Sequence, residues 1–276
     1  MLHDAVAAGK VPNVVAVAAD RDGPIYEGAA GPRAVGSDDP VTPDSVFRIM
    51  SMTKMVCTVA ALQQVERGNL ELTAPVDTYC PEFADVPVLE GFDGDNPKLR
   101  PAGSRATVEQ LVTHTTGLGY PFWNADLRRW VSITRSLHAA AVSEQGFFKR
   151  PLLADPGTTF IYGSNTDWLG KVVEAASGLP LNEYLEGNVA GPLGMNDTAF
   201  LMNVQQKANS VPVHRRGVGM ACTPHARAWG GMCNTYFWVD RTTGIAGSIH
   251  SQFLPFVHQA ALNLYVDFEQ ALYASL

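Results

Sequence analysis

Apolar residues near both ends of the chain gather in short runs separated by polar, glycine-containing turns. Two pairs of such runs occur, Val14–Ala19 with Ile25–Ala29 and Thr235–Val239 with Ile245–Ile249. Runs of five or six apolar residues on either side of a short polar turn are typical of β-hairpins. The pattern therefore predicts one hairpin close to the N-terminus and a second one late in the chain.

Helical spacing of apolar residues fills the middle of the chain and its tail. The longest such segment, Met50–Val65, holds a single charged residue, Lys54, and Gly68 after it suits a C-cap. This nearly uncharged helix is expected to be buried on most sides. Further helices are predicted at Thr107–Thr113, Asp126–Ser143, Asn165–Ser177, Leu181–Val189 and Pro255–Leu276. The stretch Gly91–Gly103, rich in Gly, Pro, Asp and Asn, predicts a surface loop.

Strands at both ends with helices between them predict an α/β fold. The two chain ends would share one antiparallel sheet that is flanked by helices. The predicted domains are a discontinuous α/β domain of residues 1–85 and 222–276, which carries the long helix, and a helical insert of residues 86–221. The stretch Thr198–Ala228, which begins in that insert and continues past its end, is mostly polar and has no clear period, so the helical region is expected to be shortened.

Composition excludes several classes of protein. The chain has 276 residues, 46% of them hydrophobic, and a net charge of -7 without a basic run, which argues against nucleic-acid binding. No apolar stretch reaches the ~18 residues of a membrane span, and the N-terminus lacks the pattern of a secretion signal, so a cytoplasmic location is expected. The four cysteines form no CxxC pair, and Cys57 is expected to be inert core packing. The seven histidines form no metal-binding pattern.

The segment Ser51-Met52-Thr53-Lys54 carries the main chemical signal. Positions i and i+3 share one face of a helix, so the Ser51 hydroxyl and the Lys54 amine can meet. A serine hydroxyl needs a base to become a nucleophile, and a desolvated lysine can be that base. The N–H of a residue at a helix start can also stabilise an oxyanion. The alternative interpretation makes Ser51 an N-cap and Lys54 a surface residue.

Two other segments are candidates for the same site. Tyr162 follows a turn and precedes a helix, where it can act as a general acid or base, although an ordinary half-buried tyrosine is the alternative. Trp229-Gly230-Gly231 stands before an edge-like strand, where paired glycines admit a substrate close to the backbone and an N–H can be a second oxyanion donor. The alternative there is a glycine bulge. No GxSxG occurs, which argues against a nucleophile-elbow hydrolase.

As a set, the motifs resemble those of the serine β-lactamase-like superfamily, the fold of class C β-lactamases and penicillin-binding proteins. The resemblance is strongest to family VIII carboxylesterases and to the fungal acyltransferase that attaches the lovastatin side chain. The motifs that carry it are, in chain order, Ser51-x-x-Lys54, Val88–Phe92, Leu111–Leu118, Tyr162–Gly170, Pro192–Met195 and Trp229–Gly231.

The resemblance implies a role for each matching residue. Ser51 would form the acyl-enzyme, Lys54 and Tyr162 would move its proton, and backbone N–H groups of Ser51 and near Gly231 would hold the oxyanion. Ser164 and Asn165 are possible supporting residues. The implied activity is that of a serine carboxylesterase or acyltransferase on a small-molecule ester or acyl thioester, with no metal and no organic cofactor. The acyl group, the acceptor and the oligomeric state stay open.

The chain departs from the family pattern at three places. Trp229-Gly230-Gly231 stands where β-lactamases of this fold carry Lys-Thr-Gly, which disfavours the alternative of a β-lactamase or D-amino peptidase because the cation that binds a carboxylate is missing. Ser164, not asparagine, lies two places after the tyrosine. Relatives also carry roughly a hundred more residues before the Trp-Gly-Gly strand, a size difference that can change the core. A catalytically dead truncated relative is therefore the remaining alternative.

Overall fold

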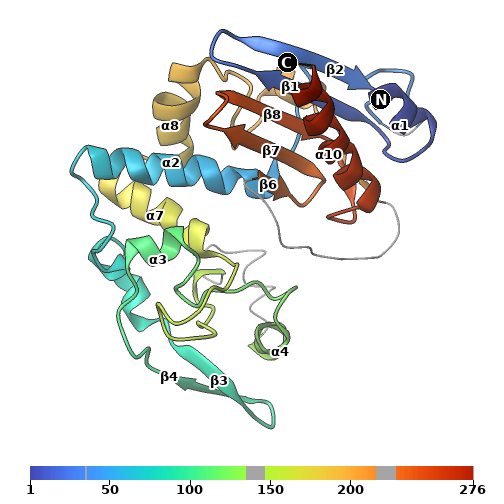
Figure 1. The fold of residues 1–276 in the computed structure, drawn as a ribbon. Coiled ribbons are helices and arrows are strands. Elements are labelled where there is room, and N and C mark those ends of the chain that lie inside the picture. Colours follow the sequence, from blue (N-terminus) through green and yellow to red (C-terminus); the bar gives the residue numbers. More distant parts are fainter. Residues whose placement is uncertain (35, 135–146, 216–227, 276) are drawn as a thin grey trace. The chain divides into compact units, whose positions relative to one another are not determined.

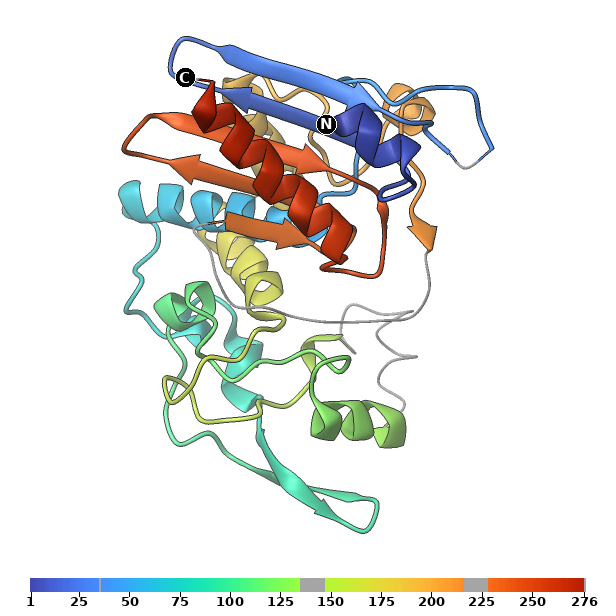
Figure 2. The same cartoon turned by 45° about the vertical axis from the view of Figure 1, so that its right-hand side comes forward.

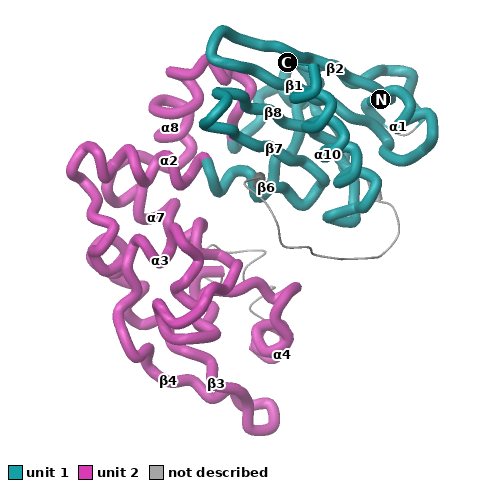
Figure 3. Tube along the Cα trace, in the orientation of Figure 1, with its two compact units in different colours: residues 1–55, 200–276 teal, residues 56–199 magenta. Residues whose placement is uncertain are grey.

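The computed structural model describes all of residues 1–276 except 35, 135–146, 216–227 and 276. The chain forms two compact units, unit 1 with residues 1–55 and 200–276 and unit 2 with residues 56–199 (Figure 3). The domain boundaries expected from the sequence, after residue 85 and before residue 222, stay a prediction, and residue 222 lies outside the described residues.

Unit 1 holds both ends of the chain. Its helices are α1 (Leu2–Ala7), the start of α2 (Thr53–Glu66), α9 (Val204–Ala208) and α10 (Gln259–Ala274). Its strands are β1 (Val14–Ala19), β2 (Pro24–Ala30), β5 (His214–Arg215), β6 (Ala228–Gly231), β7 (Thr235–Asp240), β8 (Ile245–His250) and β9 (Phe253–Leu254). Both predicted hairpins are confirmed, the first as β1–β2 and the second as β7–β8.

The two hairpins join into one antiparallel sheet. Among the described residues this sheet has five strands in the order β2-β1-β8-β7-β6, and the register across the join pairs Ala16 with Ile249. The first strand of the chain therefore pairs with one of its last strands. This arrangement confirms the predicted α/β fold class, with an antiparallel sheet built from both chain ends. Strand β6 forms one edge of the sheet.

Helix α10 covers one face of this sheet, with α1 beside it (Figures 1 and 2). Trp238 of β7 packs between Tyr265 and Phe268 of α10, with ring centroids 5.7 and 5.6 Å apart. Gly247 makes room for this indole, because a Cβ there would lie 2.2 Å from the Trp238 ring. Burying each such aromatic or large aliphatic side chain contributes about 1.5–3 kcal/mol, so this layer anchors the sheet that carries β6.

Unit 2 is mainly helical. Its helices are most of α2, with α3 (Val108–Val112), α4 (Ala125–Thr134), α7 (Asn165–Ser177) and α8 (Leu181–Leu185), and its strands are β3 (Val88–Asp93) and β4 (Asn96–Arg100). Trp168 of α7 is almost fully buried at the centre of the unit, with Phe83 and Phe148 each 4.8 Å away. The helices predicted at Thr107–Thr113 and Asn165–Ser177 are confirmed as α3 and α7: Thr107 caps α3 in a capping box, and Gly178 ends α7 in a left-handed conformation.

The structure differs from the sequence-based expectation at Gly91–Gly103. This stretch was expected to be a surface loop, but it contributes most of the β3–β4 hairpin. Gly94 at φ +56° provides the tight turn between the strands, so the glycines that indicated a loop serve the hairpin turn. Helix α1 was not predicted, and the predicted helix Asp126–Ser143 is described only as far as Thr134.

Helix α2 is less buried than its composition predicts. Its buried residues are Cys57, Ala60, Ala61 and Gln64. Met55, Val59 and Leu62 follow one another at helical spacing and are 38–48% exposed. The lack of charge therefore did not indicate burial on most sides, because an apolar stripe specifies a face without specifying what covers it. In the part of the chain that the structure describes, no helix has the length and hydropathy needed to cross a bilayer.

Candidate active site

Ser51 lies in a 3-10 turn, Met50–Met52, that leads directly into α2. Lys54 is the second residue of α2, one turn after Ser51, and both side chains are half-buried. Met50 has φ +49°, a left-handed conformation that side chains rarely adopt. Such strained positions persist only where the surroundings enforce them, and they occur often at functional turns.

The end of the sheet holds this turn from one side. A Cβ at Gly231 would lie 2.3 Å from the Ile49 carbonyl oxygen and 2.4 Å from Thr235 Oγ1, so only glycine fits there. Thr235, which is fully buried, donates its hydroxyl to the same Ile49 oxygen at 3.4 Å. The edge of β6 therefore packs against the backbone two residues before Ser51, which explains physically why the strand carries a glycine at this position.

Gln252 fixes the chain just before that turn. Its side chain is fully buried, and its Oε1 accepts from the Arg48 N–H at 2.6 Å while its Nε2 donates to the Arg48 oxygen at 3.4 Å. A side chain amide that pairs with both backbone groups of one residue acts like a short piece of partner strand. The sequence reasoning missed Gln252 and Thr235, because neither belongs to a recognisable motif.

The Trp229-Gly230-Gly231 segment was expected to stand just before an edge-like strand, but it lies within strand β6, at the edge of the described sheet. An edge strand presents backbone N–H and C=O groups that no neighbouring strand occupies. At Gly230 a Cβ would lie 2.9 Å from the Tyr236 ring, so this glycine also permits close packing. For Trp229 the structure describes the backbone only. Unit 1 thus places the turn that contains Ser51 against Gly231 of β6, with Lys54 one helical turn further along the chain.

Tyr162 lies in unit 2, in the turn that precedes α7, and is half-buried. The next residue must be glycine, because a Cβ at Gly163 would lie 2.2 Å from the Leu118 oxygen. The Tyr162 ring lies 5.8 Å from that of Tyr120 and 5.1 Å from that of Trp123. Burial, with smaller contributions from neighbouring groups, raises the pKa of Tyr120, so that phenol stays neutral at ordinary pH.

Ser164 and Asn165, the predicted supporting residues, are both buried beside Tyr162. Ser164 precedes the first turn of α7, while Asn165 is fully buried and makes several hydrogen bonds. Its Oδ1 accepts from the Thr116 hydroxyl, and its Nδ2 donates to the Leu118 oxygen at 3.2 Å and to the Ile161 oxygen at 3.3 Å. The segment around Tyr162 is therefore tied to residues 114–119. Tyr162, Ser164 and Asn165 lie together in unit 2, whereas Ser51 and Lys54 belong to unit 1.

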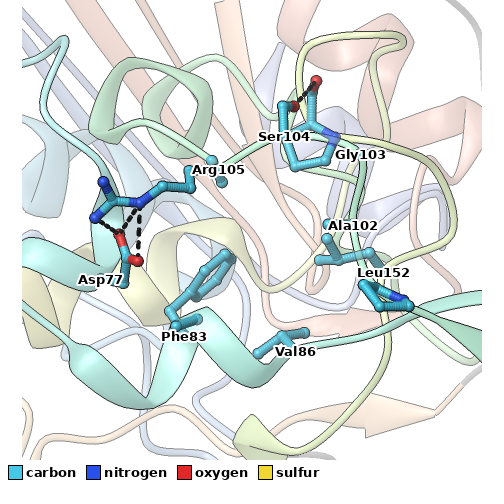
Figure 4. A pocket seen from close by; sticks show the side chains of 12 residues that line it. Asp77, Phe83, Val86, Ala102, Gly103, Ser104, Arg105 and Leu152 are labelled. Carbon is cyan, nitrogen blue, oxygen red and sulfur yellow. Dashed lines mark hydrogen bonds and ion pairs between the residues drawn. The ribbon is translucent and has the colours of Figure 1, made fainter.

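Unit 2 also contains a pocket of about 360 Å³ that includes none of the predicted site residues (Figure 4). Phe83, Val86 and Leu152 form its apolar lining, and Asp77 and Arg105 face each other on its polar side. Arg105 donates from Nε and Nη2 to the Asp77 carboxylate at 2.7–3.2 Å. This ion pair joins the two charged side chains that line the pocket.

The turn before Tyr162, whose Pro156 lines this pocket, contains a second carboxylate with strong partners. Asp155 accepts from Arg100 at 2.7 and 2.8 Å and from the Gly103 N–H at 2.7 Å. Hydrogen bonds from the Arg100 guanidinium lower the pKa of Asp155 from 3.8 to about 2. A lowered pKa in the folded state means that the stabilisation is present above about pH 4 and is lost as the pH falls towards 2.

We therefore expect Asp155→Asn to lower the melting temperature at pH 6 relative to the unmodified chain. The difference between the two proteins should shrink as the pH falls from about 4 to about 2, because protonated Asp155 no longer pairs with Arg100. Thermal melts at half-unit pH steps measure this, with the exposed Asp44→Asn as the matched control. A difference that stays constant down to pH 2 would contradict the assigned partner.

The fold is that of a β-lactamase-like α/β protein, and sequence comparison agrees. A family model described as Beta-lactamase matches residues 1–224. The chain belongs to the β-lactamase family.

Two curated relatives and one solved structure show which members of the family are similar. The chain is 38% identical over 203 residues to monacolin J acid methylbutanoyltransferase of Aspergillus terreus, which covers 71% of this chain and 49% of the relative. It is 35% identical over 205 residues to lovastatin esterase of Penicillium rubens, covering 71% of this chain and 50% of the relative. This chain thus spans about half the length of these curated relatives. Unliganded simvastatin synthase from Aspergillus terreus superimposes with a TM-score of 0.89 at 25% identity, covering 99% of this chain and 96% of that structure.

Proposed function

We propose that the chain is a serine carboxylesterase or acyltransferase that acts on small-acyl esters or acyl thioesters through an acyl-enzyme on Ser51. The observation that carries this proposal is the turn at Ser51. It follows a left-handed Met50, starts a helix that has Lys54 in its first turn, and packs against the glycine edge of β6. A nucleophile, a base and backbone donors are the groups that acyl transfer needs.

In the proposed reaction the Ser51 oxygen attacks the acyl carbonyl carbon while Lys54 Nζ takes up the hydroxyl proton. The negative charge on the carbonyl oxygen is held by the Ser51 N–H and by an N–H near Gly231. When the tetrahedral intermediate collapses, the bond to the alcohol or thiol breaks and the leaving group takes a proton. Water or an acceptor alcohol then attacks the acyl-serine, and Ser51 regains its proton.

Tyr162 is proposed to share the proton transfers with Lys54. A phenol beside an ammonium group can pass a proton to the leaving group and later remove one from the attacking water or alcohol. The tightly held turn before α7 supports this role, because a group that transfers protons must be fixed within hydrogen-bond reach of the reacting oxygen. Ser164 and Asn165 are proposed to support that turn.

The relatives support the substrate class that we propose. One is named as a methylbutanoyltransferase, which transfers a short acyl group, and another as a lovastatin esterase, which acts on an ester. Residues 229–231 read Trp-Gly-Gly, without the lysine that would bind the carboxylate of a β-lactam. We therefore propose ester or thioester substrates rather than penicillins.

This proposal predicts a clear preference between two chromogenic substrates. The kcat/KM for p-nitrophenyl butyrate should exceed that for nitrocefin by about 10- to 150-fold, since a missing charge-assisted hydrogen bond is worth about 1.5–3 kcal/mol. Initial rates over a concentration series of each substrate give both values, and Ser51→Ala measures the background for each. A higher kcat/KM for nitrocefin would refute the esterase assignment in favour of a β-lactamase.

A cytoplasmic location is also proposed, and the cysteines support it. The described residues include no disulfide, and Cys80 and Cys233 are buried thiols. Burial raises the pKa of Cys80 to about 12, which keeps this side chain an unreactive thiol. Reduced, scattered thiols are typical of reducing compartments.

A further inference from the structure

His114 contacts the chain segment around Tyr162 through both its backbone and its side chain. Its carbonyl oxygen accepts from the Ile161 N–H at 2.8 Å, directly before Tyr162. Its ring lies against the Tyr162 ring, with centroids 4.9 Å apart and planes tilted by 31°. The Gly163 N–H, directly after Tyr162, approaches His114 Nδ1 at 3.5 Å. A single residue thus contacts the chain before, at and after the tyrosine.

The position of His114 is itself tightly determined. Its side chain is 7% exposed, and its backbone has φ +57°, in the left-handed region that only a few residue types tolerate. Gly117, three residues later, lies against the backbone of Ala154, where a Cβ would be 2.3 Å from the Ala154 oxygen. The backbone that carries this buried imidazole is therefore fixed, which gives the ring a defined place beside Tyr162.

The hydrogen bonds around Asn165 determine which histidine nitrogen carries the proton. Asn165 Nδ2 lies 3.0 Å from His114 Nδ1, and the same nitrogen faces the Leu118 and Ile161 oxygens. On the other side, Asn165 Oδ1 accepts from the Thr116 hydroxyl. These contacts orient the amide with Nδ2 as a donor towards His114. Nδ1 of His114 must then be an acceptor, and the neutral ring carries its proton on Nε2.

We propose that His114 is a positioning residue for Tyr162. Its Nδ1 accepts a hydrogen bond from Asn165 Nδ2 at 3.0 Å and lies 3.5 Å from the Gly163 N–H, which ties the chain after Tyr162 to His114, and its ring supports the phenol from the side. This inference rests on the proposed function, in which Tyr162 transfers protons and must be held at a defined place. A misplacement of about 1 Å in a catalytic group can cost about 10²-fold in rate.

Three substitutions at His114 distinguish the effect of the Nδ1 hydrogen-bond acceptor from the effect of the ring that packs on Tyr162. His114→Asn tolerates the left-handed backbone and places a side-chain oxygen near the position of Nδ1, but it loses the ring. His114→Phe keeps a ring beside Tyr162 but removes the acceptor, and His114→Ala removes both. His3→Asn, at an exposed site on α1, is the matched control.

For p-nitrophenyl butyrate we expect His114→Phe and His114→Ala to lower kcat by about 10²-fold with KM changed less than about threefold. His114→Asn should recover kcat to within about tenfold of the unmodified chain, because the acceptor is restored. A kcat that stays within about twofold in His114→Phe would overturn the proposal. If His114→Ala does not fold, the Asn and Phe variants still decide between the two results.

A second measurement keeps this proposal separate from the proposed function. In protein labelled with tyrosine carrying ¹³C at Cζ, the Tyr162 signal is assigned by its loss in Tyr162→Phe. We expect this signal to shift in His114→Phe and to stay near its original position in His3→Asn. An unchanged Tyr162 signal in every His114 variant would overturn the positioning role. A chain that turns over no ester but shows the expected shifts would refute the proposed function and leave the positioning role supported.

Discussion

Replacing Ser51 with alanine should abolish turnover of p-nitrophenyl butyrate, with a loss in kcat of about 10⁴-fold or more. The substitution removes the oxygen that would form the acyl-enzyme and leaves the turn at Met50–Met52 otherwise intact. Because Ser51 is only half-buried, the free energy of unfolding should change by no more than about 1 kcal/mol. Steady-state kinetics and a thermal melt of the same preparation measure both quantities.

The control for this prediction is Ser45→Ala, which removes another half-buried hydroxyl from the same unit. It should keep turnover close to that of the unmodified chain. Retention of most of the ester turnover in Ser51→Ala would show that a different group is the nucleophile. A Ser51→Ala protein that no longer melts cooperatively would instead identify Ser51 as a structural residue of the turn.

The second large effect concerns the two proton-transfer groups. Lys54→Ala and Tyr162→Phe should each lower kcat/KM by about 10²- to 10⁴-fold, the usual contribution of general acid–base catalysis. If the two side chains act as one unit, the double variant should be little worse than either single variant. Rates of acyl-enzyme formation under single-turnover conditions provide the most direct comparison.

Two conservative controls accompany these variants. Lys10→Ala removes an exposed lysine of unit 1, and Tyr79→Phe removes a phenol of unit 2 that accepts from the Glu71 N–H. Both should retain normal kinetics. A near-normal kcat in Tyr162→Phe would mean that this tyrosine serves packing alone, and a double variant whose losses multiply would mean that Lys54 and Tyr162 act independently.

Local pattern was enough to predict much of the fold. The two terminal hairpins follow from short apolar runs on either side of polar turns, and α7 follows from its apolar spacing together with Gly178 at its end. The β3–β4 hairpin was missed because Gly91 and Pro97 inside its strands are poor strand formers, and a two-stranded edge tolerates them. Exposure along α2 was misjudged because composition does not specify what covers an apolar face.

The candidate site could be predicted only in part, because local pattern shows neighbours along the chain and not contacts between distant residues. The Ser51–Lys54 pair is visible in sequence because both residues lie on one helix, three positions apart. The partners that hold the turn come from far along the chain: Gln252 is 204 residues from Arg48, and Thr235 is 186 residues from Ile49. His114 was visible only as part of a motif, without any indication that it contacts Tyr162.

The most direct test of the central claim is the intact mass of the protein after reaction with a fluorophosphonate probe. An activated serine oxygen displaces fluoride and forms a bond to phosphorus, which leaves a stable adduct of known mass. We predict one adduct on the unmodified chain, located by peptide mapping at Ser51, and none on Ser51→Ala. Equal labelling of both proteins, or a folded unmodified chain that acquires no adduct, would contradict Ser51 as the nucleophile, and the second result would indicate a catalytically inactive member of the family.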